Sequence, residues 1–370
     1  MKFYNDREKA KGGVYKVDRE TGKYLAGAVF NLYTADDIYS VDGKLLFAAG
    51  ELVATSPETG ADGYTYFDCD IPIRGEYYGS SIRKDATTNS GNYIVKELRA
   101  PLGYYVNEEP MEVTFTYDGQ AIMVLDNTCS NKPTEMWVSK RDLTNDEELP
   151  GATLAIKDMD GNIVTTWVST NEPHRVTGLH FGESYTLTEI RAADGYALAD
   201  NITFRLIQKT DEGGNPLEEC EVYYLTTKNI LFWKWDDWRL LDDATVIMRD
   251  DITKVQISKK DLTTKEELPG AELTLTDEKG NEIDRWVSTD APHYMERLPA
   301  GKYTLTEVTA PDGYAIAERV EFEVLPTGEV QTFEMFDDTI KVKISKVDIT
   351  TNEELPGAEL VIKDKDGHRD

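Results

Sequence analysis

Hydrophobic and polar residues alternate along most of the chain, and this pattern gives the first expectation for the fold. The stretches 302–308 (KYTLTEV) and 341–347 (KVKISKV) place every second side chain on one face. Such alternation is typical of a β-strand with one buried face. Turn-forming sequences such as Asp160-Gly161-Asn162 separate the stretches, and no long amphipathic helix is indicated. The pattern predicts short antiparallel strands packed as β-sandwiches of about 80–120 residues.

The chain also repeats itself at the scale of a small domain. A first motif, Lys-x-Asp followed by a Gly-Ala turn, has its lysines at Lys16, Lys140, Lys259 and Lys346. A second motif places a Glu shortly before Gly-Tyr, and a third closes each complete unit with a hydrophobic stretch ending in Asp. The fourth copy lacks the second and third motifs, so we expect it to be frayed or docked on the third unit. The predicted domains are 1–130, 131–254 and 255–340, with 341–370 as the truncated start of a fourth repeat.

Two of the predicted domains carry insertions, around 39–92 and around 209–243. The second insertion contains Trp233, Trp235 and Trp238 within six residues. Clustered tryptophans can form a stacking platform for a glycan or a patch for a partner protein. The alternative is a strand pair that packs its aromatic side chains on the sandwich.

The chain is strongly acidic, which restricts its partners. Its 370 residues include 40 Lys and Arg against 69 Asp and Glu, a net charge of −29. Nucleic-acid binding requires clustered positive charge, and anionic membrane surfaces attract basic segments, so we expect neither. No run of apolar residues is long enough for a transmembrane helix, and the first residues lack the apolar segment of a signal peptide. We therefore expect either a cytosolic protein or a piece of a longer chain.

The cysteine and histidine content predicts no metal site or cofactor. Cys69, Cys129 and Cys220 are isolated, form no metal-binding spacing and are too few for a disulfide scaffold. No phosphate-binding loop or Ser/His/Asp set is recognisable. A protein of this kind outside the cell would need another means of covalent stabilisation.

Taken together, the motifs resemble those of Cna-B/SpaA-type domains of Gram-positive pilins and adhesins, over residues 11–340 and the stub that follows. The resemblance implies an all-β fold of tandem immunoglobulin-like or prealbumin-like β-sandwiches in an elongated rod. In this family a Lys on the first strand and an Asn or Asp on the last condense to a side-chain amide, promoted by a Glu on a middle strand. Carried over by position, it implies the sets Lys16–Glu97–Asp126, Lys140–Glu189–Asp250 and Lys259–Glu307–Asp337.

Each closing strand ends in two candidate acceptors, so the residues alone leave the choice open. The pairs are Asp126/Asn127, Asp250/Asp251 and Asp337/Asp338. Whichever residue faces the core is the acceptor, because side chains alternate between the faces of a strand. The first of each pair matches the family spacing and is favoured.

The residue types suit this chemistry. A Lys attacks a carbonyl only as the neutral amine, and burial in an apolar core favours that form. The same burial favours the neutral carboxylic acid of an Asp acceptor, and a neighbouring Glu can hydrogen-bond the acceptor and shuttle a proton. An Asp acceptor would release water and an Asn acceptor ammonia. Folding supplies the proximity, which is worth roughly 7–11 kcal/mol of barrier in well-oriented cases.

The resemblance implies a structural stalk in a cell-surface adhesin or pilin-like protein, monomeric and extracellular, with no enzymatic turnover beyond one cross-linking reaction in each domain. Force on the chain ends would pass through each bond and bypass the domain interior. The alternative is an adhesive module that recognises a glycan or a host protein through the insertions. No residue pattern favours an accessory segment of a hydrolase.

Overall fold

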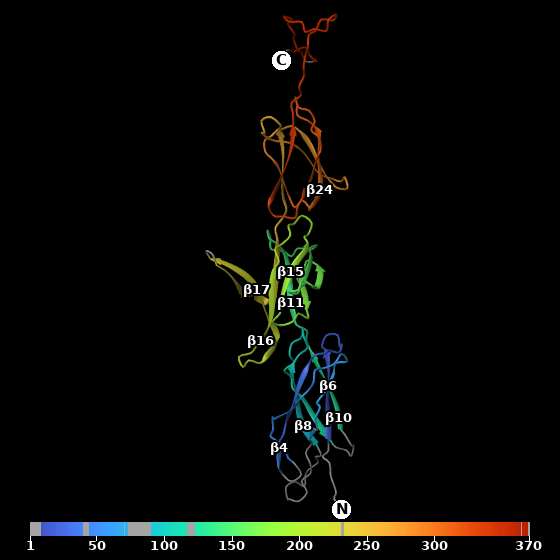
Figure 1. Cartoon of the computed structure of the whole chain (residues 1–370), viewed down its shortest axis with the longest axis vertical. Helices are drawn as coiled ribbons and strands as arrows, with labels where there is room; N and C mark the ends of the chain where they lie inside the picture. The colour runs from blue at the N-terminus through green and yellow to red at the C-terminus, as the bar shows by residue number, and fades with distance from the viewer. Residues whose placement is uncertain are drawn as a thin grey trace, which may run out of the picture. The chain divides into compact units, whose positions relative to one another are not determined.

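The computed structural model describes residues 9–39, 44–69, 71–72, 90–116, 123–230, 233–363 and 365–368. The described chain is built of strands, with one short 3-10 helix, η1 (Asp242–Ala244), which confirms the predicted all-β class. It divides into two compact units, Met1–Ile252 and Thr253–Asp370 (Figure 1). The first unit contains two β-sandwiches and the second contains one.

The first sandwich pairs two sheets and carries a small hairpin. One sheet has the order β10-β1-β6, with β7 also paired to β1, and the other has the order β5-β2-β8-β9. The strands of the first sheet are β1 (Lys9–Asp18), β6 (Tyr64–Tyr66), β7 (Ile71–Pro72) and β10 (Met123–Asn131). Those of the second are β2 (Val29–Thr34), β5 (Leu52–Thr55), β8 (Ser90–Arg99) and β9 (Met111–Thr116), and the hairpin is β3 (Ile38–Tyr39) with β4 (Leu45–Phe47). β10 ends one residue past the predicted boundary at 130.

The second sandwich has a small sheet and a large one. The small sheet, β14-β11-β19, consists of β11 (Glu135–Asp142), β14 (His174–Thr177) and β19 (Thr245–Asp250). The large sheet, β13-β12-β15-β16-β17-β18, consists of β12 (Thr153–Lys157), β13 (Ile163–Val168), β15 (Ser184–Arg191), β16 (Ile202–Thr210), β17 (Pro216–Ile230) and β18 (Trp233–Leu240). The predicted insertion forms the β17–β18 hairpin, and Figure 1 shows β17 extending away from the sandwich.

The third sandwich repeats this plan without the extra hairpin. Its sheets are β23-β20-β26 and β22-β21-β24-β25. The strands are β20 (Lys254–Asp261), β21 (Glu272–Asp277), β22 (Glu282–Val287), β23 (His293–Glu296), β24 (Gly301–Thr309), β25 (Val320–Val324) and β26 (Val330–Asp337).

The alternation at 341–347 predicts a strand that does not form. Among the described residues after Asp337, the structure contains single bridges such as Val347 with Glu354 but no strand of several residues. Ile349 is fully exposed. An isolated strand is not stable in water without partners that cover its apolar face, and the described residues after Asp337 contain no second strand to pair with this segment.

The first and last strands of every sandwich lie side by side and run parallel, which differs from the predicted antiparallel arrangement. The pairs are β1 with β10, β11 with β19, and β20 with β26. Alternation along a strand reveals which side chains share a face but not the direction of the neighbouring strand. The pairing brings the two ends of each domain's sequence together.

Alternation also decides which side chains enter the core. On β15, Tyr185, Leu187 and Glu189 are buried between more exposed neighbours, and β24 repeats this with Tyr303, Leu305 and Glu307. Each sandwich has its own hydrophobic cluster. The glutamates therefore follow the apolar side chains inward.

Truncation of Leu305 tests this arrangement. We expect Leu305→Ala, at a fully buried position, to lower the free energy of unfolding of the third sandwich by about 3 kcal/mol. Val308→Ala, at a position 42% exposed on the same strand, serves as the control and should cost about 0.5 kcal/mol or less. Urea titration of the full chain, read by hydrogen exchange of β24, measures both. Equal effects would contradict the inward orientation of Leu305.

Candidate functional site: a buried lysine, glutamate and acceptor in each sandwich

In the second sandwich, the structure brings Lys140, Glu189 and Asp250 together inside the core. Lys140 Nζ donates to Asp250 Oδ1 and lies 3.0 Å from Glu189 Oε1. Lys140 is on β11, Glu189 on β15 of the opposite sheet and Asp250 on β19. None of the three is more than 6% exposed. The parallel register places Lys140 opposite Met248, so Asp250 lies two residues further on and on the same face.

The third sandwich repeats this centre. Lys259 Nζ donates to Asp337 Oδ1 and lies 3.0 Å from Glu307 Oε1. The register again offsets the acceptor by two residues, because Lys259 lies opposite Met335. All three side chains are buried.

In the first sandwich Asn131 lies beside the lysine, and the predicted placement of Asp126 there is wrong. Lys16 Nζ donates to Asn131 Oδ1 and lies 2.9 Å from Glu97 Oε1. Asp126 is exposed, lies opposite Gly13 and accepts a hydrogen bond of 3.0 Å from the Tyr64 hydroxyl. Asn131 is five residues further along β10, and an odd shift moves a side chain to the other face of a strand.

The sequence contains a signal for Asn131 that the motif comparison missed. Nine positions separate each acceptor in the structure from the lysine of the next repeat: 131 to 140, 250 to 259 and 337 to 346. A sulfur-containing residue also precedes each acceptor by two positions: Cys129, Met248 and Met335. Alignment on these features, rather than on the next Asp, would have selected Asn131.

The second member of each predicted acceptor pair lies outside the centre. Asp338 pairs with Lys341 at 2.7 Å and is half-buried. Asp251 accepts a hydrogen bond from the backbone N–H of Ile252. Asn127 lies opposite Val14, four residues before Asn131, the partner of Asp18.

The hydrogen bonds of Asn131 offer a comparison for the aspartates that lie beside the other two lysines. The Asn131 Nδ2 amide donates to both carboxylate oxygens of Glu97, each at 3.0 Å. Asp250 Oδ2 occupies the corresponding place but is buried, and no hydrogen-bond partner is found for it among the described residues. A protonated Asp250 could donate toward Glu189 as Asn131 donates toward Glu97, and it would satisfy both groups.

Electrostatics agree with a neutral acid. Burial, more than any other influence, raises the pKa of Asp250 to about 7, and the Glu189 carboxyl adds to the rise while Lys140 opposes it. Burial likewise raises the pKa of Asp337 to about 6, again against the effect of its lysine. The charged form of a carboxyl is penalised in an apolar core.

A backbone N–H fixes the second oxygen of each glutamate. Asn107, Ala199 and Ala317 donate to Oε2 of Glu97, Glu189 and Glu307 at 2.7, 2.7 and 2.6 Å. Each donor follows its glutamate by ten residues, just after the Gly-Tyr motif. This contact leaves Oε1 directed at the lysine.

A tyrosine and an aspartate lie beside each centre. The sequence shows them only as parts of the repeated motifs and does not predict their contact. The hydroxyls of Tyr104, Tyr196 and Tyr314 donate to Oδ2 of Asp18, Asp142 and Asp261 at 2.7, 2.8 and 2.7 Å. Each aspartate is the Asp of Lys-x-Asp and lies directly opposite the acceptor in the parallel register. The pairing of Gly-Tyr with Lys-x-Asp explains why both motifs recur together.

The first centre differs from the others in a thiol. Cys129 Sγ lies 3.0 Å from Lys16 Nζ, where Met248 and Met335 face the other lysines. Burial raises the pKa of the Cys129 thiol, which keeps it neutral. No disulfide joins the three cysteines, all of which lie in the described part of the chain.

The tryptophan hairpin is only partly described. Trp238 lies under the guanidinium of Arg205, whose Cζ is 4.3 Å from the ring centre. For Trp233 and Trp235 the structure describes only the backbone pairing with Ile230 and Lys228. Recognition of a glycan or host protein through this hairpin stays a prediction.

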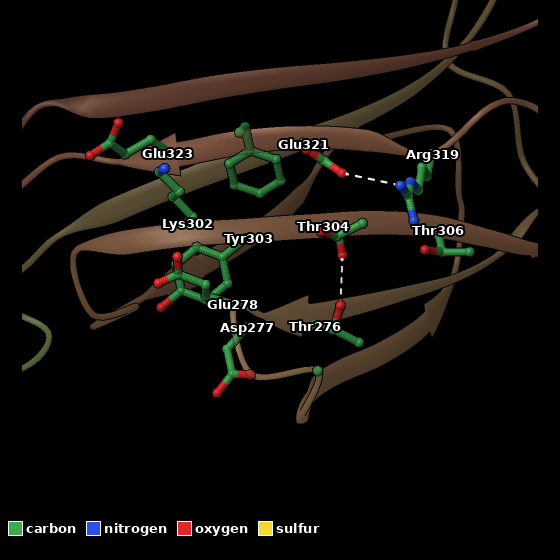
Figure 2. A pocket seen from close by; sticks show the side chains of 12 residues that line it. Thr276, Asp277, Glu278, Lys302, Tyr303, Thr304, Thr306, Arg319, Glu321 and Glu323 are labelled. Atoms are coloured by element: carbon green, nitrogen blue, oxygen red, sulfur yellow. Dashed lines mark hydrogen bonds and ion pairs between the residues drawn. The ribbon is translucent and has the colours of Figure 1, made fainter.

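A hollow of about 720 Å³ lies on the outer face of the third sandwich (Figure 2). Lys302, Thr304 and Thr306 point into it from β24, on the opposite face of the strand from Glu307. Arg319 pairs there with Glu321 at 3.5 Å. The hollow is therefore separate from the lysine centre.

The described residues contain no cluster of His, Cys, Asp or Glu suited to a metal ion. No helix among them is long and apolar enough to cross a membrane.

Solved structures similar to this chain include one protein of Bacillus anthracis and two major pilins. The Bacillus anthracis TIE protein is 21% identical, with a TM-score of 0.39, over 90% of this chain and 51% of its own, so this chain spans about half its length. The major pilin BcpA of Bacillus cereus is 15% identical (TM-score 0.34; 90% and 100% covered), and the major pilin SpaD of Corynebacterium diphtheriae is 13% identical (TM-score 0.41; 90% and 98% covered).

No curated protein matches the chain. The sequence pattern of the SpaA prealbumin-like fold domain matches three regions, residues 10–128, 134–215 and 253–339, each of which includes one lysine centre in whole or in part. These regions cover more than half of the chain, which therefore belongs to the SpaA family of prealbumin-like fold domains.

Proposed function

We propose that each sandwich closes a covalent amide between its lysine and its acceptor, and that the chain is a structural stalk segment of a cell-surface pilin or adhesin. The observation that carries this proposal is the threefold recurrence of a buried lysine amine against a carboxyl or carboxamide, with a glutamate 2.9–3.0 Å from the amine. Membership of the SpaA family supports the surface role.

The reaction needs no external substrate. The neutral Lys Nζ attacks Cγ of the acceptor, and the glutamate takes a proton from the amine and returns it to the leaving group. The new Cγ–Nζ bond replaces the Cγ–Nδ2 bond of Asn131, releasing ammonia, or the Cγ–Oδ bond of Asp250 and Asp337, releasing water. The glutamate ends in its starting state, so the reaction is balanced without a co-reactant.

Exclusion of water makes the three groups effective. Once the glutamate has taken the amine proton, it can donate a hydrogen bond to the developing oxyanion, and this bond is stronger in an apolar core than in water. Because the strands hold amine and acceptor in contact, the entropy of bringing them together is lost during folding rather than in the reaction.

The bonds would give the stalk its mechanical strength. They would join residues 115, 110 and 78 positions apart, and cross-links over loops of this size restrict the unfolded chain by roughly 4–5 kcal/mol. Force would cross each domain through the bond, leaving only the nine-residue connectors between acceptor and next lysine under tension. The domain interiors would be protected from unfolding.

Intact mass under denaturing conditions tests the bonds and the corrected acceptor together. We expect the purified chain to be lighter than its sequence by one ammonia and two waters. Asn131→Ala should abolish the ammonia loss and keep both water losses. Asp126→Ala is the matched control and should keep all three losses, because Asp126 is outside the centre. Loss of the first bond in Asp126→Ala, but not in Asn131→Ala, would reverse our assignment.

Replacement of one glutamate tests its role. In Glu189→Gln the carboxylate that moves the proton is gone, so the second sandwich should retain one water and lose about 4–5 kcal/mol of stability. Glu212→Gln, at an exposed position in the same sandwich, should change neither quantity. Mass spectrometry and urea unfolding provide the readouts, and a cross-linked Glu189→Gln sandwich would remove the glutamate from the mechanism.

The acceptors predict different pH dependences within one molecule. Because a carboxylate is a poor electrophile, bond formation should slow as pH rises through about 7 for Asp250 and about 6 for Asp337, where the neutral acid is lost. Asn131 has no such proton to lose, so the first bond should not slow in this range.

The measurement starts from full chain recovered unfolded from inclusion bodies and refolded at a series of pH values. Branched peptides from timed digests report each bond separately. Identical profiles for all three bonds would contradict the role of acceptor protonation.

A further inference from the structure

A short segment that begins at the Tyr of each Gly-Tyr motif contacts the glutamate of its lysine centre and residues that adjoin the lysine and the acceptor. In the second sandwich this Gly-Tyr segment is 196–199. The Tyr196 hydroxyl donates to Asp142 Oδ2 at 2.8 Å, on the strand that carries Lys140. The Ala197 N–H donates to the carbonyl of Asp251 at 2.8 Å, directly after the acceptor. The Ala199 N–H donates to Glu189 Oε2 at 2.7 Å.

The first and third sandwiches repeat all three contacts. In the first, Tyr104 bonds Asp18, and the N–H groups of Tyr105 and Asn107 donate to the Lys132 carbonyl at 3.0 Å and to Glu97. The corresponding contacts in the third join Tyr314 to Asp261, Ala315 to the Asp338 carbonyl at 3.0 Å and Ala317 to Glu307. Two of the three contacts use backbone groups, and only the tyrosine contact depends on a side chain of the segment.

The aspartate that receives the tyrosine also connects to the acceptor's backbone. Asp142 Oδ1 accepts the N–H of Thr144 at 2.7 Å and so closes the turn after β11. Inside that turn, the Leu143 N–H donates to the carbonyl of Asp250 at 2.8 Å. Arg19 and Leu262 make the same contact with Asn131 and Asp337, each at 2.9 Å. The tyrosine hydroxyl is therefore linked through one carboxylate to the backbone of the acceptor.

We propose that Tyr104, Tyr196 and Tyr314 are positioning residues for amide formation, each holding the Gly-Tyr segment so that glutamate, lysine strand and acceptor keep a reactive arrangement. This inference rests on the proposed function. The tyrosines do not touch the reacting atoms and act through Asp18, Asp142 and Asp261. Reactions of this kind are sensitive to small displacements, since a shift of about 1 Å can cost about 100-fold in rate.

The test is Tyr196→Phe in the full chain, refolded from the unfolded, uncross-linked state. The ring is kept and only the hydroxyl is lost. We expect the second bond to form about tenfold more slowly. The first and third bonds are measured from the same digests as internal references, and they should form at the parent rate. Tyr223→Phe is the matched control, because it also removes a tyrosine–carboxylate hydrogen bond of 2.7 Å, to Glu221, away from the centre.

A second measurement separates positioning from stability alone. Tyr196→Phe is also made in the Glu189→Gln background, where urea unfolding gives its effect on stability without the cross-link. A purely structural hydroxyl would lower that stability but leave the bond-formation rate of folded molecules unchanged. Tyr314→Phe repeats the test in the third sandwich, where the tyrosine is less buried, with Tyr294→Phe, at a position 49% exposed, as its control.

A rate within about twofold of the parent, for the second bond in folded Tyr196→Phe and for the third bond in folded Tyr314→Phe, overturns the inference. Equal slowing of all three bonds by one substitution overturns it too, because the effect would not be local. A parent chain that forms no bonds at all would instead refute the proposed function, and the two failures are thus distinguishable.

Discussion

A lysine amine buried in an apolar core is the constraint on which each sandwich depends. Charged groups are costly to remove from water unless they are paired or neutralised. Each lysine meets a glutamate and an acceptor on strands that the fold brings together from opposite sheets and from opposite ends of the domain's sequence. The recurring motifs are the parts of the sequence that make this meeting possible.

The structure brings together two of the three predicted sets of side chains and all three lysine–glutamate pairs, and the predicted β-sandwich class is confirmed. Those predictions rest on repeated motifs and on alternation, neither of which depends on how the strands pair. The acceptor of the first sandwich depends on how β10 pairs with β1, a contact between residues more than 100 positions apart. Local alternation does not determine such a register, and Asp126 was selected where Asn131 faces the lysine.

Other features could not be predicted because they use backbone groups. The N–H groups that hold the glutamates belong to Asn107, Ala199 and Ala317, whose side chains take no part in the contact. The parallel direction of the first and last strands also leaves no mark on the residue pattern. By contrast, the tyrosines and aspartates recur as motifs in each repeat, but only the fold shows that they are in contact.

Each cross-link would join residues near the two ends of its domain, and this affects the resistance of the chain to proteolysis. With the bond closed, a peptide bond hydrolysed anywhere between Lys16 and Asn131, or within the corresponding loops of 110 and 78 positions, leaves both fragments attached through the side-chain amide. The chain would be severed only by cleavage in the short connectors. Long surface insertions such as the β17–β18 hairpin lie inside these loops, so they could vary in sequence or be nicked while the chain stayed continuous.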